Sequence, residues 1–132
     1  MSSASFVART PLPLLPLRKG LVLPSGVTQL PIGRPKSRAL FDAVRVGDRI
    51  IIAFQKDGRV EDPATGDLHE TVVVAKVREK VERKGRAPVL VVEGLDRGTL
   101  LERAQDEPYA THRVIEIVEP RANDVEAHAL AH

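Results

Sequence analysis

Lys36 and Ser37 are neighbours in the sequence, and a serine paired with a lysine can act as nucleophile and base in peptide hydrolysis. The two side chains must then face each other, because the amine has to take the hydroxyl proton. Neighbouring residues of a helix point about 100° apart, and Pro35 predicts that a helix starts here. The Gly-Lys dipeptide of a nucleotide-binding phosphate loop is also absent from the sequence. We therefore expect neither peptide cleavage nor ATP hydrolysis from this chain.

The carboxylates and histidines do not predict a metal site. Glu61, Asp62 and Asp67 gather in residues 56–69, but the acidic spacing of a calcium loop is missing and turn-forming residues surround them. His128 and His132 have an i, i+4 spacing that can share a metal, yet no third ligand lies nearby. We expect a solvated loop and a solvated tail. Two further histidines lack a spaced partner and are expected at the surface or on a strand face: His69 and His112.

Residues 76–86 carry the strongest local charge, with six basic and two acidic side chains. The simplest interpretation is the solvated face of a strand, where charges also discourage edge-to-edge pairing. Two alternatives are a nucleic-acid stripe and a contact for an acidic protein. No aromatic residue lies between Phe54 and Tyr109, which argues against a base-stacking platform.

The composition predicts one β-rich domain. The chain has 132 residues, of which 42% are hydrophobic but only 3% aromatic, so Val, Leu and Ile must build the core. The absence of cysteine excludes disulfides and fits a reducing compartment. A net charge of +2 is too small to draw the whole molecule to nucleic acid. No apolar run is long enough to span a membrane and no secretory signal is evident, so we expect a cytoplasmic protein.

Residues 12–34 combine many apolar side chains with repeated prolines. Proline cannot donate to a sheet ladder, so this segment predicts two or three short strands on the rim of a sheet. We expect these prolines at strand ends or edge positions: Pro13, Pro16, Pro24 and Pro31.

The rest of the chain predicts one helix and several strands. The helix should run from Pro35 to near Gly47 and bury Leu40, Ala43 and Val44, with Phe41 beside them. Residues 49–55 read as a buried strand, and residues 56–69 as a long loop that is functional or mobile. Residues 71–82 alternate as a strand with one wet face, and a turn at 83–86 leads back into a second strand. Residues 99–106 are expected to be helical and 111–118 a final strand.

Several short motifs carry a resemblance to a known family. Pro16, Leu17 and Arg18 form a PLR motif, Gly33 is the third residue of a PIGR motif before the helix, and residues 92–97 read VEGLDR. In their order and spacing these motifs resemble the N-terminal substrate-binding domain of the Lon family of ATP-dependent proteases, over residues 12–120. The resemblance implies a mainly β, PUA-like pseudobarrel of about six strands with one firm helix. Three further motif residues are expected to be structural: Glu93, Gly94 and Arg97. Gly94 would permit a bulge or a tight exit from the strand, and Arg97 would pair with Glu93 or with nearby carbonyls.

The resemblance implies a domain that recognises unfolded or degron-bearing proteins and helps assemble the protease. Its partners would be those substrates, the remaining Lon modules and sister subunits; ATP and magnesium would belong to the missing ATPase module, with no cofactor in this chain. We expect residues 1–10 to be a disordered lead-in, 11–120 the domain, and 121–132 the start of a truncated linker or helix. The chain would thus be a piece of a longer protease or a small stand-alone relative.

An apolar patch beside positive charge is the predicted substrate-binding surface. The leucines offer contacts for hydrophobic stretches, and the basic residues at the helix start suit acidic flanks; alternatively the leucines are core. The candidate substrate-binding residues are Leu12, Leu14, Leu21, Leu23, Arg34, Lys36 and Arg38. Lys19-Gly20 after the PLR motif and Pro35 after Arg34 depart from the family pattern, which puts substrate preference in doubt. Two other functions remain open, an RNA-binding module using residues 76–86 and a pure oligomerisation domain.

Overall fold

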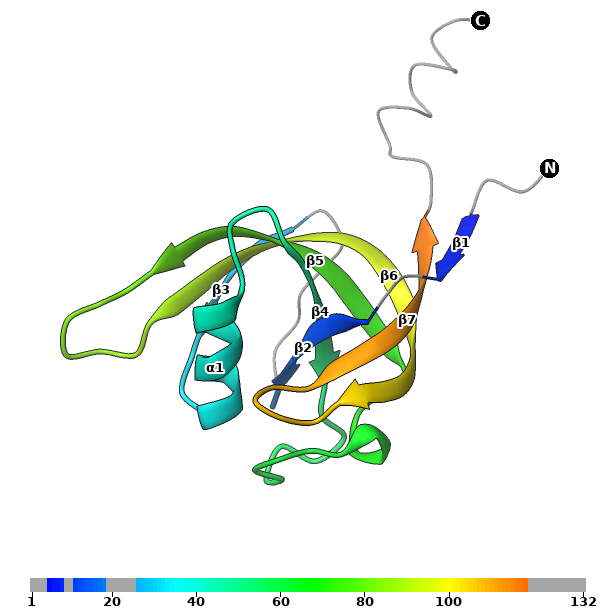
Figure 1. The fold of residues 1–132 in the computed structure, drawn as a ribbon, viewed down its shortest axis with the longest axis horizontal. Helices are drawn as coiled ribbons and strands as arrows, with labels where there is room; N and C mark the ends of the chain where they lie inside the picture. Colours follow the sequence, from blue (N-terminus) through cyan, green and yellow to red (C-terminus); the bar gives the residue numbers. More distant parts are fainter. Residues whose placement is uncertain (1–4, 9–10, 19–25, 119–132) are drawn as a thin grey trace, which may run out of the picture.

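The structure is a computed structural model that describes residues 5–8, 11–18 and 26–118. It is mainly β with one α-helix, as predicted, and Figure 1 shows strands curling around a common centre with the helix on one side. The elements are β1 (Ser5–Ala8), β2 (Leu12–Leu17), β3 (Val27–Pro31), α1 (Pro35–Ala43), β4 (Arg49–Phe54), the 3₁₀ turn η1 (Thr65–Asp67), β5 (Thr71–Val81), β6 (Val89–Gln105) and β7 (Thr111–Val118).

Five of the strands close into a ring. The strand order is β1-β7-β2-β4-β5-β6-β3, and a further pairing of β7 with β6 joins β7, β2, β4, β5 and β6 into a barrel. Strands β1 and β3 add to the ring at β7 and β6. Only β2 and β4 run parallel, because β3 and α1 lie between them in sequence and supply the crossover. β1 lies in the segment for which the sequence predicted a disordered lead-in.

The prolines lie where ladder bonds are few. Pro31 is the last residue of β3, which pairs only with β6. Pro13 is the second residue of β2, and Pro16 is the second from its end. Pro24 lies outside the described residues.

β6 bends sharply enough to pair with β5, β3 and β7. One bulge places Leu95 as an extra residue between the pairs Val74–Asp96 and Ala75–Gly94, so the bulge expected at Gly94 is confirmed. Further along, a Cβ on Gly98 would come within 2.9 Å of Val114 Cγ2, so the close approach of β6 to β7 requires glycine there. The sequence prediction of a helix over residues 99–106 is wrong: β6 continues to Gln105, because its pairing with β7 outweighs local helix preference.

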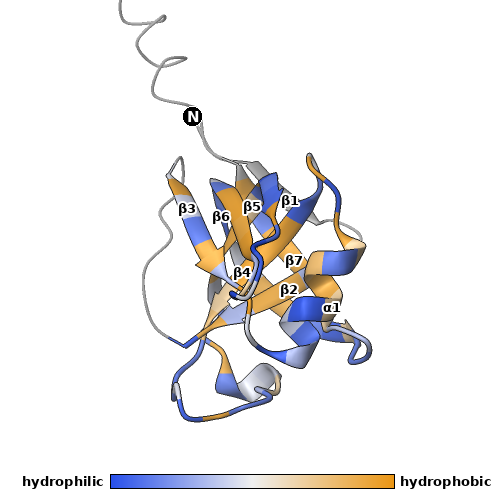
Figure 2. Ribbon diagram, turned by 90° about the vertical axis from the view of Figure 1, so that its left-hand side faces the viewer, coloured by the Kyte–Doolittle hydropathy of each residue, from blue (hydrophilic) through white to orange (hydrophobic). Residues whose placement is uncertain are grey.

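Two hydrophobic clusters fill the space on either side of the sheet. One lies between the sheet and α1 and includes Leu40 and Phe41, and the other includes Leu14 and Val114 and draws on all five ring strands. Figure 2 shows hydrophobic residues along the strands and hydrophilic ones on the outward side of α1 and in the lower loop. The two clusters bury β5 on both faces over residues 72–75, so the predicted wet face begins only at Lys76.

The helix is shorter than predicted. It ends at Ala43, where the Val44 N–H donates to the Leu40 carbonyl. Gly47 does have a positive φ of 98°, but it lies in the turn before β4 rather than at the helix cap. Ala43 is exposed, and Ser37 takes a place on the buried face instead.

Candidate functional site

A cavity of about 450 Å³ lies where four segments meet, at the first turn of α1, and is called here the cavity beneath α1. Its walls come from β2, the start of α1, the loop before η1 and the β6–β7 turn. The lining residues are Leu14, Pro16, Arg34, Pro35, Lys36, Ser37, Glu61, Asp62, Pro63, Arg103, Glu107 and Ala110. Apolar side chains from β2, the loop and the turn therefore lie beside a charged rim.

The cavity exists because β2 and β7 separate. They pair only at Leu12–His112 and Pro13–Thr111, and the Leu14 N–H then donates to the Ala110 carbonyl at 2.9 Å. Beyond that point β2 pairs only with β4, and Pro16 has no N–H to offer another strand. The loop and the β6–β7 turn border this unpaired edge of β2.

Lys36 ties three of the segments together. Its Nζ lies 3.1 Å from carboxylate oxygens of Asp62, Asp106 and Glu107, so the helix start holds both the loop and the turn. Partial burial opposes the charged amine, but hydrogen bonds to these carboxylates outweigh it and raise the pKa of Lys36. The Lys36 amine thus has carboxylates as its partners, and no contact between its Nζ and the Ser37 hydroxyl occurs among the described residues.

Arg103 joins the β6–β7 turn to the loop and to a buried histidine. Its guanidinium donates to Asp106 at 2.8 Å, to the Pro63 carbonyl at 2.9 Å and to His112 Nε2 at 3.0 Å. Desolvation by burial lowers the pKa of His112, and its Nδ1 lies 3.1 Å from the Leu101 carbonyl. The prediction of a strand-face position holds for His112, but its ring is fully buried rather than at the surface.

Two arginines anchor the loop from the opposite side. Arg18, the last residue of the PLR motif, donates to the Gly58 carbonyl at 2.7 Å and to Glu61 at 2.8 Å. Within the part of the chain that the structure describes, the Arg34 side chain donates only to the Glu61 carbonyl, at 3.3 Å. Burial and the neighbouring Arg18 charge lower the pKa of Arg34, and the carboxylates of Glu61 and Asp62 offset this only in part. The loop carboxylates thus serve as partners of cations, and no group of metal ligands occurs among the described residues.

The structure brings some of the predicted substrate-binding residues together. Leu14, Arg34 and Lys36 line the cavity. Leu14 is nevertheless only 3% exposed and packs in the core, so its expected place in an exposed patch is wrong. Leu12 is half-buried next to the same cluster, whereas Leu21 and Leu23 lie outside the described residues.

Arg38 does not belong to the cavity. It lies on the exposed face of α1, where it pairs with Asp42 at 3.2 Å and with Glu82 at 3.0 Å. Its guanidinium also lies 5.4 Å from the centre of the Phe41 ring. These contacts fix α1 to the β5–β6 hairpin, and none of them touches a cavity residue.

Sequence reasoning missed the cavity residues of the loop and turn: Pro63, Arg103, Glu107 and Ala110. The length of the loop at 56–69 suggested a functional segment, but it pointed only to Pro63. Among the motif residues, Glu93 pairs with Arg78 at 2.8 Å. A Cβ on Gly33 would meet nothing within 4 Å.

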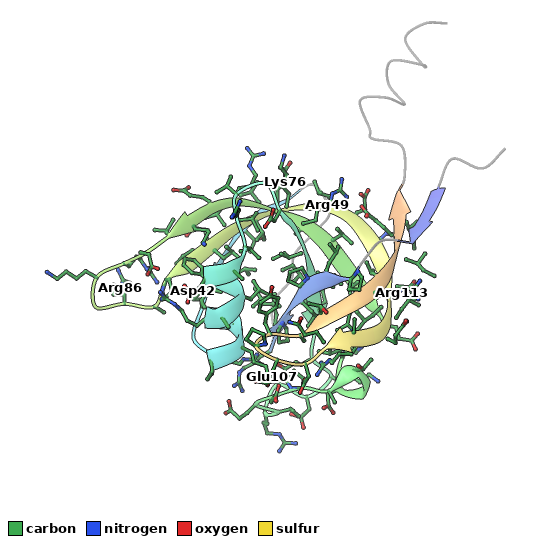
Figure 3. All side chains as sticks on the ribbon, viewed as in Figure 1. Asp42, Arg49, Lys76, Arg86, Glu107 and Arg113 are labelled. Atoms are coloured by element: carbon green, nitrogen blue, oxygen red, sulfur yellow. The ribbon has the colours of Figure 1, made fainter. Side chains whose placement is uncertain are left out.

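The basic segment is less available than its sequence suggests. Arg78 pairs with Glu93, and Arg83 donates twice to the Ala87 carbonyl. Lys80 is not on a solvated face: it is half-buried, donates to the Val44 carbonyl at 2.8 Å, and lies 5.0 Å from the centre of the Phe41 ring. Figure 3 shows Arg86 at the hairpin and, well away from it, Glu107 below α1, where it lines the cavity.

No helix within the described part of the chain is long and apolar enough to cross a membrane.

Comparisons with known proteins agree with the fold. A family model for the ATP-dependent protease La (LON) substrate-binding domain matches residues 11–131. "Lon protease 4" of Sorangium cellulosum is 43% identical over 108 residues, which cover 82% of this chain and 13% of that protein. The Lon protease of Anaeromyxobacter dehalogenans is 42% identical over 123 residues, or 91% of this chain and 14% of that protein. The chain thus spans only a small part of the length of these relatives.

Two solved structures share the fold. The N-terminal domain of Mycobacterium avium complex Lon protease matches with a TM-score of 0.59 and 26% identity, covering 86% of this chain and 56% of that one. A Lon N-terminal domain protein from Xanthomonas campestris matches with a TM-score of 0.57 and 18% identity, covering 86% of this chain and 61% of that one. The second likeness concerns the fold alone.

Proposed function

The chain belongs to the family of Lon substrate-binding domains, and from this membership we propose that it is the noncatalytic recognition domain of an ATP-dependent protease, binding unfolded or degron-bearing proteins for degradation. Its further partners are sister subunits and the other modules of that protease. ATP and magnesium bind to those modules, and this chain needs no cofactor of its own. The complete protein acts in the cytoplasm.

The cavity beneath α1 is the observation that carries this proposal. Its apolar lining from Leu14, Pro16, Pro63 and Ala110 accepts an apolar side chain, which a folded protein keeps in its core and an unfolded one exposes. The charged rim contacts the polar backbone and side chains that flank such a residue. The cavity therefore distinguishes unfolded from folded proteins by whether an apolar side chain is exposed, and it does not require a long sequence motif.

The unpaired edge of β2 supports an extended substrate. Next to the cavity this strand pairs with β4 alone, so its other edge borders the lining of the cavity. An extended segment can run along such an edge and place alternate side chains toward the cavity. Ordering the segment costs conformational entropy and the contact area is small, so we expect affinities in the micromolar-to-millimolar range.

Isothermal titration with a reduced, denatured model protein and with its native form tests the proposal. We expect heat of binding only with the unfolded form. Ala110→Leu should weaken this binding by filling the cavity, whereas Ala87→Leu on the exposed hairpin should leave it unchanged. Equal binding of the folded and unfolded forms would contradict the proposal.

A further inference from the structure

The first turn of α1 has no cap of its own. Arg34 occupies the N-cap position without a capping side-chain hydrogen bond, and the first turn holds no acidic residue. Pro35 lacks an N–H, and the first bond within the helix is from the Arg38 N–H to the Arg34 carbonyl. The N–H groups of Lys36 and Ser37 thus lack a partner among the described residues, at the positive end of the helix dipole.

The Ser37 hydroxyl is a second polar group here, besides the backbone N–H groups, that lacks a hydrogen-bond partner. The residue is only 6% exposed, it lines the cavity, and its hydroxyl makes no hydrogen bond within the described part of the chain. Among the described residues, Gln55 Oε1 is the only side-chain polar atom that is both fully buried and without a hydrogen-bond partner, so the Ser37 oxygen is not fully buried. The Ser37 oxygen is therefore reached from the cavity, and a bound acceptor would remove the cost of leaving this hydroxyl unpaired.

Arg34 supplies a positive charge at the same place. It lines the cavity, and across the described ranges it forms no ion pair, only the 3.3 Å contact with the Glu61 carbonyl. Burial and the nearby Arg18 disfavour its charged form and lower its pKa. An additional anion beside Arg34 would relieve both effects.

The charged rim is electrically balanced, and Arg34 is the one cation in it without a carboxylate partner among the described residues. Its three cations, Arg34, Lys36 and Arg103, are matched by three lining carboxylates, so the net charge of the lining is zero. These carboxylates already have partners: Glu61 pairs with Arg18, while Asp62 and Glu107 pair with Lys36. A polyanion such as nucleic acid requires a run of unpaired cations, which this lining lacks. A single carboxylate needs only the helix start and Arg34.

We propose that the cavity binds the carboxyl-terminal residue of a protein substrate. The terminal carboxylate accepts hydrogen bonds from the N–H groups of Lys36 and Ser37, from the Ser37 hydroxyl and from Arg34. The apolar side chain of the same residue lies against Leu14 and Ala110. The last residue of a protein carries a carboxylate and a side chain on the same Cα. This arrangement matches the cavity, in which a polar wall at the helix start adjoins an apolar wall. About 450 Å³ falls within the roughly 300–1,000 Å³ of small-ligand pockets.

This inference rests on the proposed function and names the part of the substrate that is recognised. Fluorescence anisotropy with a short fluorescein-labelled peptide ending in leucine tests it in three forms: a free acid, an amide, and an amide with glutamate before the leucine. We expect the free acid to bind about tenfold more tightly than either amide, because charge-assisted hydrogen bonds are lost. If the glutamate amide bound as tightly as the free acid, the site would read side-chain carboxylates and the proposal would be overturned.

Variants assign the effect to the helix start. Ser37→Ala and Arg34→Gln should each weaken binding of the free acid several-fold and leave the amide unchanged, while Arg86→Gln at the hairpin tip should change neither. Thermal unfolding checks that the variants are folded. If free acid and amide bind equally, or neither binds, while denatured proteins still bind, this inference fails and the proposed function stands. If denatured proteins do not bind either, both fail.

Discussion

His112 is a titratable residue held in the core without a charge. It is fully buried on β7, and Arg103 donates to its Nε2, so Nε2 acts as the acceptor. The proton then sits on Nδ1 and points to the Leu101 carbonyl, 3.1 Å away. Protonating Nε2 would place a second positive charge against Arg103, while Glu102 attracts the ring only weakly.

Because of His112, we expect the free energy of unfolding to decrease as the pH is lowered. Burial lowers the pKa of His112 in the folded chain below its ordinary value of 6.5, so the unfolded state binds more protons. Its contribution is therefore complete above pH 6.5 and is lost as the pH falls below that value. The Tm measured by thermal unfolding should decrease from pH 7.5 to pH 5.5. This decrease should be smaller in His112→Gln and unchanged in His69→Gln, because His69 is exposed. A Tm that is flat over this range would contradict the assignment.

Leu14 is a core residue in spite of its place in the proline-rich segment. We expect Leu14→Asp to lower the free energy of unfolding by several kcal/mol, because it buries an unpaired carboxylate at a site that is 3% exposed. Val27→Asp, at a site that is 65% exposed, should change it by about 0.5 kcal/mol or less. Chemical denaturation measures both variants. Equal effects at the two positions would show that Leu14 is not core.

At the scale of elements, the loop of residues 56–69 is a fixed wall of the cavity. Leu68 is buried in the core, the Lys56 N–H donates to the Asp67 carbonyl, and the Gln55 amide donates to the Val60 carbonyl. Outside these internal bonds, charged contacts with Arg18, Lys36 and Arg103 attach the loop to its neighbours. The loop therefore depends on a few cations for its position.

Removing the most connected cation should loosen the loop without unfolding the domain. Lys36→Met deletes the contacts to Asp62, Asp106 and Glu107. We expect amide hydrogen exchange to rise in residues 58–67 and in the β6–β7 turn, and to stay slow in β4 and β5. Lys76→Met, on an exposed strand position, is the matched control. Unchanged exchange in the loop would mean that Arg18 and Arg103 hold it alone.

The elements were predicted from the sequence where local pattern and burial agree. Residues 49–54 form a strand because a β-branched run suits a site buried on both faces, and Pro35 starts the helix as expected. The pattern failed where tertiary pairing decides: residues 99–105 are a strand because β7 lies beside them. The cavity could be predicted only in part. Arg34 and Lys36 lie at a helix start that the sequence predicts, whereas Arg103 lies near the end of β6, whose position depends on the closed ring.

At the scale of the whole molecule, positive charge is dispersed and largely engaged. In the hairpin at residues 76–86, Arg78, Lys80 and Arg83 each have a partner within the domain. Arg49 and the buried Glu116 form another pair at 2.9 Å. Arg78 pairs with a carboxylate, while Lys80 and Arg83 donate to backbone carbonyls, so three of the six cations of this segment are held by the domain itself.

We therefore expect no specific RNA complex at physiological salt. Replacing Lys76, Lys84 and Arg86 together by Glu should leave binding of a single-stranded RNA oligonucleotide as weak as in the wild type, measured by anisotropy over a range of salt concentrations. A genuine phosphate-binding stripe would instead show an affinity that falls log-linearly with salt and is lost in the triple variant. That result would favour the RNA-binding alternative.

The pairing of β1 with β7 has a mechanical consequence. Ser5 lies opposite Val118 and Ala8 opposite Ile115, so the two strands meet with their outer ends together. Figure 1 shows β1 and the end of β7 side by side, away from the helix. A force that pulls residues 5 and 118 apart would break the hydrogen bonds between β1 and β7 one after another, because these bonds lie perpendicular to the strands. The five-stranded ring closes without β1, so under load this junction would yield first and the cavity would keep its shape.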